Sequence, residues 1–507
     1  MIDAFGAVRE AARQSNGCLY LGAGRDGPAW AGIEQAVLVL GPPRSGKTSG
    51  LVIPTVLGAP GAVVSTSTKP DVLRATAHAR GQVGGCWLYD PSGTVEAPAG
   101  VERLRWSPVT GCARWDDALL VARSLVGSTR PSAARGGSDI GVDHWTERAQ
   151  ALLAPVLHAA AIDGADLATV LSWIDRRQAA PALGILDREG RAVAADLLAG
   201  IAATDERERS GIWSTASGVL AAYRSEAALA TTVAPDFDPE TFCDSSATLY
   251  ICATGRHQSL AAPLVVGLLT DIRSAAYARA ADHGGGDSPG DRPPVVLALD
   301  EVANIAPVPD LPAMVSEGGS QGVVTMACLQ DLSQARGRWG PAAEGFLSLF
   351  GTTVVLSGIG DVRTLEDISV LAGEQEVETR SISTPVKPAG VGLARAVVDR
   401  MVWGPNRLGP EPVSSVTTST VMRRNLPVDV VGRGEPGMAL VMNEKNVMGW
   451  VGLTRYYADE PWRTAALGPE RAMTGPTERE RQRQRPPVLT PPLPGPGGHR
   501  TGRELGM

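Results

Sequence analysis

Short apolar runs rich in Val, Leu, Ile and Thr recur along the chain, and most are bounded by Gly, Pro or Asp. Runs of this length between turn-forming residues are typical of buried strands. They lie at 35–40, 61–67, 86–90, 247–253, 294–300, 322–329 and 352–357. Because stretches of helical character separate these runs, the pattern predicts an α/β fold with a mostly parallel sheet.

Residues 115–236 show a different periodicity, with apolar side chains spaced as on one face of an α-helix. Two such stripes follow an aspartate that is suited to cap a helix N-terminus. The stripes are Trp145, Ala149, Leu152, Val156 and Ala159 after Asp143, and Leu167, Val170, Leu171 and Ile174 after Asp166. We therefore predict that an all-α domain is inserted into the α/β domain.

The predicted domain organisation follows from this insertion. Residues 1–114 form the first part of the α/β domain, 115–236 the inserted all-α domain, and 237–466 the second part of the α/β domain. A flexible connection is expected at 281–294. Residues 467–507 are rich in Pro, Arg and Gln, which predicts a disordered tail. This tail is either a solvated extension or a docking segment for a partner or an acidic lipid surface.

The composition narrows the possible functions. The net charge of −7 excludes a general polyanion binder, so DNA would have to meet a local basic surface, such as a pore lined by several subunits. The six cysteines form no C-x-x-C pair and the histidines show no ligand spacing, so Mg²⁺ with nucleotide is the one metal expected. No signal peptide is recognised, and no apolar run approaches the ~18–20 residues of a transmembrane helix. These features predict a soluble, cytoplasmic chain.

The pattern G-x-x-x-x-G-K-[ST] occurs directly after the run at 35–40, where it predicts a phosphate-binding loop. In such a loop backbone N–H groups surround the phosphates, the Lys reaches the β and γ oxygens, and the Thr hydroxyl binds Mg²⁺. Pro43 has no N–H, so the donors must come from the residues after it. The predicted ATP-binding residues are Gly41, Arg44, Ser45, Gly46, Lys47, Thr48 and Ser49.

A second motif supplies carboxylates at the end of another predicted strand, about 250 residues further along the chain. Apolar Val295–Leu299 is followed by Asp300 and Glu301, at the carboxyl end where ligands bind in parallel sheets. We expect Asp300 to help hold Mg²⁺ and Glu301 to orient and deprotonate the attacking water. A kinase does not need the second acid, so the pair favours ATP hydrolysis.

These motifs resemble the type IV secretion coupling proteins, the TraG/TraD-like ATPases of conjugative DNA transfer. The resemblance covers roughly Leu19 to Tyr457. Besides the phosphate-binding loop, it rests on VVSTSTKPDVLRATAHARG, LYDPSG, HWTERAQALL, LDEVANIAPVPDLPAMVSEGGSQGV, LQDLSQARGRWG and SGIGDVRTLEDIS.

The resemblance implies a RecA-like P-loop NTPase domain that assembles as a homo-hexamer at the inner face of the cell membrane. It implies that the inserted all-α domain docks a DNA–relaxase complex or protein effectors, which are then passed to the type IV secretion channel. It also implies that Gln330 is the polar sensor near the γ-phosphate, beside Glu301 as the other catalytic residue.

Two features depart from the family. Its members usually begin with transmembrane helices, and none is predicted here, so recruitment to the membrane would be peripheral and through partners. Where members commonly read G-R-S-R-G, this chain has Gly318–Gly322 without an arginine. The positively charged side chain that acts on a neighbouring subunit is therefore missing from this loop, and Arg336, Arg338 and Arg363 are candidate substitutes.

Two other functions remain open at the level of sequence. One is an FtsK- or HerA-like DNA translocase, against which the helical insert and the stretch after Asp300 count. The other is a nucleotide-gated docking platform with little turnover, which the missing arginine favours and Glu301 disfavours.

Overall fold

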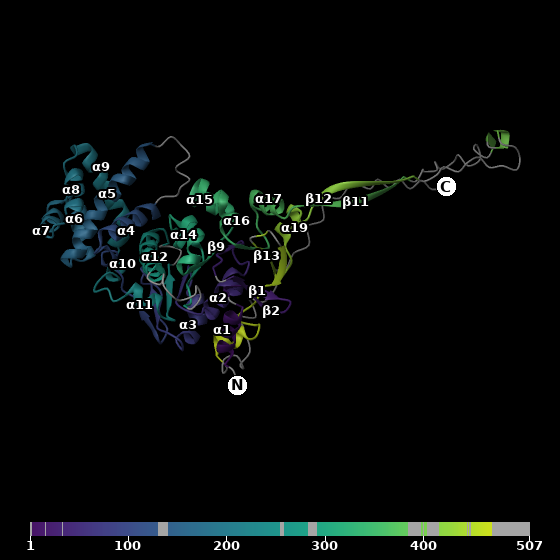
Figure 1. Cartoon of the computed structure of the whole chain (residues 1–507), viewed down its shortest axis with the longest axis horizontal. Helices are drawn as coiled ribbons and strands as arrows, with labels where there is room; N and C mark the ends of the chain where they lie inside the picture. The colour runs from purple at the N-terminus through teal and green to yellow at the C-terminus, as the bar shows by residue number, and fades with distance from the viewer. Residues whose placement is uncertain are drawn as a thin grey trace, which may run out of the picture.

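The computed structural model describes residues 3–15, 17–32, 34–129, 140–253, 258–281, 292–383, 397–398, 400–402, 415–443, 445 and 448–468. In these residues the chain forms a 12-stranded sheet in the order β2-β1-β14-β13-β10-β3-β9-β8-β4-β7-β5-β6. Helices cover the sheet, and a bundle of helices extends from one end of the molecule (Figure 1).

The eight strands from β10 to β6 in this order are all parallel to their neighbours. They are β3 Val37–Leu40, β4 Val63–Ser67, β5 Cys86–Tyr89, β6 Val101–Arg103, β7 Thr248–Cys252, β8 Val295–Leu299, β9 Val323–Leu329 and β10 Thr352–Leu356. Every apolar run that predicted a strand forms one here. The predicted α/β fold with a mostly parallel sheet is therefore confirmed.

The other edge of the sheet is antiparallel and was not predicted. It comprises β1 Gly17–Gly24, β2 Gly27–Gly32, β13 Met438–Asn443 and β14 Met448–Gly452. The stretch that forms β1 and β2 is rich in Gly and Ala, so it carries no continuous run of β-branched residues. Pairing with β14, which comes from the far end of the sequence, places these strands in the sheet.

Alternate side chains of the central strands enter two cores, one on each face of the sheet. On β3, Val37 and Val39 join one core, whereas Leu38 and Leu40 join the other. The first core is covered by α1 Ala4–Gln14, α2 Ile53–Gly58, α3 Asp71–Arg80 and α20 Trp462–Leu467. The second is covered by α12 Gln258–Ala281, α13 Val302–Ile305, α14 Leu311–Glu317, α15 Leu332–Trp339, α16 Phe346–Leu349, α17 Val362–Leu371 and α19 Val428–Arg433.

Between β6 and β7 the described residues form helices and no strand. They are α4 Trp115–Ser128, α5 Ile140–Asp163, α6 Leu167–Asp175, α7 Ala180–Arg188, α8 Ala192–Ala202, α9 Glu206–Val219, α10 Glu226–Ala230 and α11 Pro239–Cys243. Helices α5, α6, α7, α8 and α9 form the bundle at one end of Figure 1, whereas α11 packs against α12. The buried side chains of the bundle belong to the same core as α12, and α4 packs directly against that helix. The limits 115–236 of a separate domain stay a prediction.

The two predicted helix caps have different outcomes. The Asp166 side chain accepts a hydrogen bond from the backbone N–H of Thr169 at 2.9 Å, so it caps α6 as predicted. The cap at Asp143 is wrong, because α5 already begins at Ile140 and Asp143 lies inside its first turn. The start was placed too late because the aspartate nearest the stripe was taken as the helix boundary, although Val142, three residues before Trp145, continues the helical spacing.

A two-stranded ribbon stands apart from the main sheet. It consists of β11 Glu374–Ser383 and β12 Ser415–Arg424, which are antiparallel and pair from Glu374–Arg424 to Ser383–Ser415. The ribbon projects away from the body of the molecule (Figure 1). The predicted connection at 281–294 and the predicted tail at 467–507 lie mostly outside the described residues. Among the residues that are described, no helix has both the length and the apolar character needed to cross a bilayer.

Candidate nucleotide-binding site

The predicted phosphate-binding loop connects the end of β3 to a helical segment that begins at Thr48 and continues into α2. Arg44 has a φ of 67° and Gly46 a φ of 100°, so the loop curls back on itself before the helix starts. A side chain at Gly46 would place its Cβ 2.7 Å from Leu453 Cδ2. The position therefore requires glycine both for its backbone and for this close contact. The N-terminal N–H groups of a helix in this place are suited to bind phosphate.

Lys47 is almost completely buried, with 6% of its surface exposed. Its ammonium donates to the backbone carbonyl of Gly41 at 2.5 Å and to that of Pro42 at 3.1 Å. A lysine held over the loop in this way carries a positive charge into the pocket. The arrangement can neutralise phosphate charge after the ammonium exchanges carbonyl oxygens for phosphate oxygens.

Thr48 and Asp300 connect the two motifs that the sequence keeps about 250 residues apart. The Thr48 hydroxyl donates to Asp300 Oδ2 at 2.6 Å. Asp300 is buried, and burial raises the pKa of its carboxyl, while the hydrogen bond from Thr48 and the charge of Lys47 act in the opposite direction. A hydroxyl and a carboxylate oxygen side by side are the hard ligands that Mg²⁺ binds, so these two residues fit a Mg²⁺–nucleotide site.

Glu301 occupies a left-handed backbone conformation, with φ 55° and ψ 44°, which is uncommon for a residue other than glycine. Its Oε2 accepts a hydrogen bond from the Asn304 side-chain amide at 3.0 Å. The strained turn ends β8 and leaves the half-buried Glu301 in the wall of the pocket next to Asp300. Sequence reasoning missed Asn304, although its position three residues after Glu301 was a usable signal.

A pocket of about 560 Å³ lies at the carboxyl ends of β3, β4 and β8. It is lined by Pro43, Arg44, Ser45, Gly46, Lys47, Thr48, Ser49, Ile53, Ser67, Thr68, Lys69, Asp71, Asp300, Glu301, Tyr456 and Tyr457. The structure thus brings together most of the predicted site residues. The loop after β4 could have been found from its place after a predicted strand, whereas no sequence signal marks the two tyrosines.

Gly41 and Gln330 do not line this pocket, although each directly follows the carboxyl end of a strand on the same side of the sheet. Gly41 follows β3 and donates its N–H to the carbonyl of Leu329 at 3.1 Å. Gln330 follows β9, which lies between β3 and β8, and its backbone N–H donates to the Gln334 side chain at 2.8 Å. A sensor role for Gln330 therefore stays a prediction that needs its side chain to turn toward the pocket.

The glycine-rich loop Gly318–Gly322 lies at the amino ends of β8 and β9, whereas the pocket lies at the carboxyl ends of the strands. The Gly322 carbonyl accepts from the N–H of Val295 at the start of β8, and a Cβ on Gly319 would lie 2.2 Å from the carbonyl oxygen of Glu34, before β3. Only Gly322, with φ 74°, needs glycine for its backbone conformation, while Gly318 and Gly319 are needed for close packing. This loop is not part of the pocket of its own chain.

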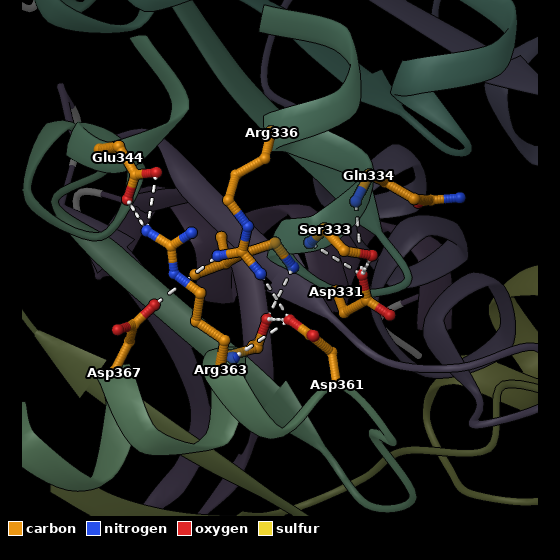
Figure 2. Close-up of polar contacts among 10 residues, drawn as sticks. Asp331, Ser333, Gln334, Arg336, Glu344, Asp361, Arg363 and Asp367 are labelled. Carbon is orange, nitrogen blue, oxygen red and sulfur yellow. Dashed lines mark hydrogen bonds and ion pairs between the residues drawn. The ribbon is translucent and has the colours of Figure 1, made fainter. Parts of the chain in front are cut away.

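The three arginines that could replace the missing charge each have a partner within the chain. Figure 2 shows Arg336 and Arg363 side by side among carboxylates. Arg336 contacts Asp361 at 2.6 Å and Asp367 at 3.7 Å, and Arg363 contacts Glu344 at 2.8 Å. Arg338 donates to the carbonyl of Ser128, and burial lowers its pKa to about 10. Of the three side chains, that of Arg363 is well exposed, at 56%.

Comparison with known proteins identifies one family and one fold. The family described as "Type IV secretory system Conjugative DNA transfer" matches residues 6–391. Among curated proteins no match is found.

Solved structures of the bacterial conjugative coupling protein TrwB are similar to this chain. The unbound TrwBdeltaN70 structure aligns with a TM-score of 0.60 and 18% sequence identity, over 89% of this chain and 92% of the other. TrwB in complex with ADP and Mg²⁺ aligns with a TM-score of 0.58 and 18% identity, over 83% of this chain and 86% of the other. At this identity the structural likeness shows the fold.

Proposed function

The chain belongs to the type IV secretion family of conjugative DNA-transfer coupling proteins, and from this premise we propose that it is an ATP-hydrolysing coupling protein. The contact between Thr48 and Asp300, with Glu301 as the next residue, carries the proposal. It joins a phosphate-binding loop to a carboxylate pair at the carboxyl edge of a parallel sheet, where such sheets bind ligands. Complexes of TrwB with ADP and Mg²⁺, with a non-hydrolysable ATP analogue and with a non-hydrolysable GTP analogue support binding of a purine nucleotide, of which we propose ATP.

The proposed chemistry assigns a task to each group in the pocket. Backbone N–H groups between Arg44 and Thr48 bind the phosphates, and Lys47 leaves the carbonyls of Gly41 and Pro42 to contact the β and γ oxygens. Thr48 and Asp300 hold Mg²⁺, which when bound neutralises charge on the phosphates. Lys69, which the loop after β4 places in the same pocket, adds a second positive charge.

Glu301 is the proposed general base. Its carboxylate accepts one hydrogen bond from Asn304, which fixes its orientation and leaves the other oxygen to take the proton of the attacking water. Gln330 is proposed as the polar sensor, since it lies at the end of the strand between β3 and β8.

The proposed partners are those of a coupling protein. In a homo-hexamer the Gly318–Gly322 loop of one subunit would lie against the pocket of the next subunit. Within one chain the two are apart, because the loop lies at the amino ends of the strands and the pocket at their carboxyl ends. The helical bundle would dock a DNA–relaxase complex or a protein effector, and the secretion channel would receive it. We propose that the chain works in the cytoplasm at the inner face of the cell membrane.

A nucleotide-gated docking platform is the second candidate. It is favoured by the absence of an arginine from Gly318–Gly322 and by the internal partners of Arg336, Arg338 and Arg363. Both functions require nucleotide binding, but only the first requires turnover.

The decisive experiment measures phosphate release from Mg²⁺–ATP by the purified chain, with and without single- and double-stranded DNA, together with the mass of the assembly. The Glu301→Gln variant tests the base, and Glu10→Gln is the control because Glu10 is an exposed residue of α1 outside the pocket. DNA-stimulated release that Glu301→Gln abolishes and Glu10→Gln leaves intact supports the ATPase. Tight ATP binding without release under every condition supports the docking platform instead.

A further inference from the structure

The segment that follows the carboxylate pair connects the nucleotide pocket to α4, which packs against the helical bundle. Asp300 and Glu301 line the pocket, and residues 302–310, here called the linker segment, form α13 and the loop that leads to α14. Ile305, Ala306 and Val308 of this segment are buried, with at most 4% of their surface exposed. Because the linker segment is packed along its length, its two ends cannot shift independently.

The far end of the linker segment lies against α4. The carboxylate of Asp310 is 3.6 Å from the guanidinium of Arg123 on α4 and 3.9 Å from that of Arg273 on α12. A Cβ on Gly127 of α4 would lie 2.6 Å from Pro309 Cγ, so the loop reaches the helix backbone where the helix has no side chain. Since α4 packs against both α5 and α12, the linker segment ends on the helix that joins the bundle to the body of the molecule.

Helix α15 fastens the linker segment and α4 to each other. Trp339 on α15 donates from Nε1 to the carbonyl of Val308 at 2.8 Å, and Arg338 donates to the carbonyl of Ser128, the last residue of α4. A cation at the carboxyl end of a helix is stabilised by the helix dipole. The linker segment, the end of α4 and α15 therefore form one packed unit.

At the pocket end, the same unit holds the proposed base. The Glu301 carbonyl accepts from the backbone N–H of Asn304 at 2.9 Å and from that of Ile305 at 3.0 Å, so α13 is built directly on Glu301. The Asn304 side chain in turn holds the Glu301 carboxylate at 3.0 Å. The left-handed conformation of Glu301 persists only where the surrounding structure enforces it. A displacement of the linker segment therefore changes the position of the Glu301 carboxylate.

We propose that the linker segment and α4 couple the nucleotide pocket to the helical bundle, so that a partner docked on the bundle controls the position of Glu301. This regulation rests on the proposed ATP-hydrolysing function of the pocket. Coupling between distant sites is carried by contiguous packing and ion pairs of this kind. It is also reciprocal, because any effect of the bundle on the pocket is matched by an equal effect of nucleotide on the bundle. The coupling can therefore be measured with nucleotide alone.

The test measures backbone amide exchange in the full-length chain by mass spectrometry, with and without Mg²⁺ and a non-hydrolysable ATP analogue. The parent is compared with Asp310→Asn, which removes both ion pairs of Asp310, and with Arg338→Met, which removes the guanidinium at Ser128 and keeps an apolar chain. Asp163→Asn is the matched control, because Asp163 of α5 pairs with Arg188 of α7 at 2.6 Å, within the bundle but outside the packed unit.

Asp300 and Glu301 are restrained by bound nucleotide, so we expect the amides at 120–128 of α4 to exchange about fivefold or more slowly in the parent when the analogue is bound. This slowing should fall to about twofold or less in Asp310→Asn and in Arg338→Met, and it should persist in Asp163→Asn. Slower exchange at 44–52, in the phosphate-binding loop, should occur in all four chains and shows that each is folded and has nucleotide bound.

A parent that binds the analogue but exchanges equally at 120–128 with and without it overturns the inference and leaves the proposed function standing. Slowing that persists in both folded variants also overturns the inference, because the coupling would then bypass the linker segment. A parent that binds no nucleotide, by calorimetry and by exchange at 44–52, refutes the proposed function, and this inference with it.

Discussion

The hydroxyl of Thr48 donates a hydrogen bond of 2.6 Å to the carboxylate of Asp300, although 252 residues separate them in the sequence. A second contact holds Asp300 in place, since the Thr66 hydroxyl at the end of β4 donates to the backbone carbonyl of Asp300 at 2.9 Å. The segment after β3 and the end of β4 therefore both contact Asp300 at the end of β8, and this convergence turns two motifs into a single candidate catalytic site.

Lys47→Ala should abolish nucleotide binding. The removed ammonium is buried at the turn of the loop, whereas Lys69, the other lysine in the pocket, follows a different strand. We expect no heat of binding with Mg²⁺–ATP in the millimolar range. Lys445→Ala, at an exposed lysine outside the pocket, is the control and should bind like the parent. Parent-like affinity in Lys47→Ala would contradict the assignment of the loop.

Glu301→Gln should retain ATP and lose hydrolysis, because an amide cannot accept the proton of water. General-base catalysis is worth about 10²–10⁴ in rate, so the loss of turnover should fall in that range. Asn304→Ala should reduce turnover less, since it leaves the base in place but frees its orientation. Single-turnover phosphate release from preloaded ATP measures the hydrolysis rate of both variants. Release at the parent rate in Glu301→Gln would show that another group is the base.

Asp300 should make the stability of the nucleotide-free chain depend on pH. Burial raises the pKa of this carboxyl above the ordinary 3.8, so the folded state binds its proton more tightly than the unfolded state. The contribution of Asp300 to stability is therefore present at low pH, and it is lost as the pH rises from the ordinary pKa through the raised one.

Thermal unfolding of the parent and of Asp300→Asn, measured across this acidic range, checks the sign. Asparagine keeps an oxygen that can accept from Thr48 and has no charge to bury. We expect its melting temperature relative to that of the parent to increase with pH. A difference that is constant or decreases with pH would rule out the raised pKa.

Arg363 is the arginine best placed to act on a neighbouring subunit, because its side chain is exposed and its single described ion pair, with Glu344, lies at the surface. If it does so, Arg363→Ala should reduce DNA-stimulated hydrolysis by about 10³-fold or more and leave ATP binding unchanged. Without stimulation the chain should turn over below ~10 s⁻¹, an ordinary enzyme rate.

Arg336→Ala provides the contrast to this prediction. Its guanidinium is mostly buried against Asp361, which also accepts from the N–H of Thr364 at the start of α17. Its loss should lower stability by about 1–3 kcal/mol, visible as a lower melting temperature, with little effect on stimulated turnover of the folded protein. A stimulated rate unaffected by Arg363→Ala and lost in Arg336→Ala would reverse the two roles.

The sequence by itself determined the features that depend on local pattern. The apolar runs at 37–40 and 295–299 became strands because a continuous β-branched or leucine-rich segment can be buried on both faces of a parallel sheet. The phosphate-binding loop was recognisable because its glycine, lysine and threonine must occupy fixed places within a few residues. The stripe after Asp166 likewise predicted α6 and its cap, since helical spacing and capping are both local properties.

Only the tertiary structure decided which distant segments share the site. The tyrosines after β14 reach the pocket through strand order, which hydrophobic periodicity does not encode. The glycine-rich strands β1 and β2 escaped prediction because their stretch carries no continuous run of β-branched residues, although residues 18–21 of β1 are buried in the core. The internal partners of Arg336 and Arg338 were also beyond the sequence, since the availability of a charged group depends on which carboxylates and carbonyls the fold places within its reach.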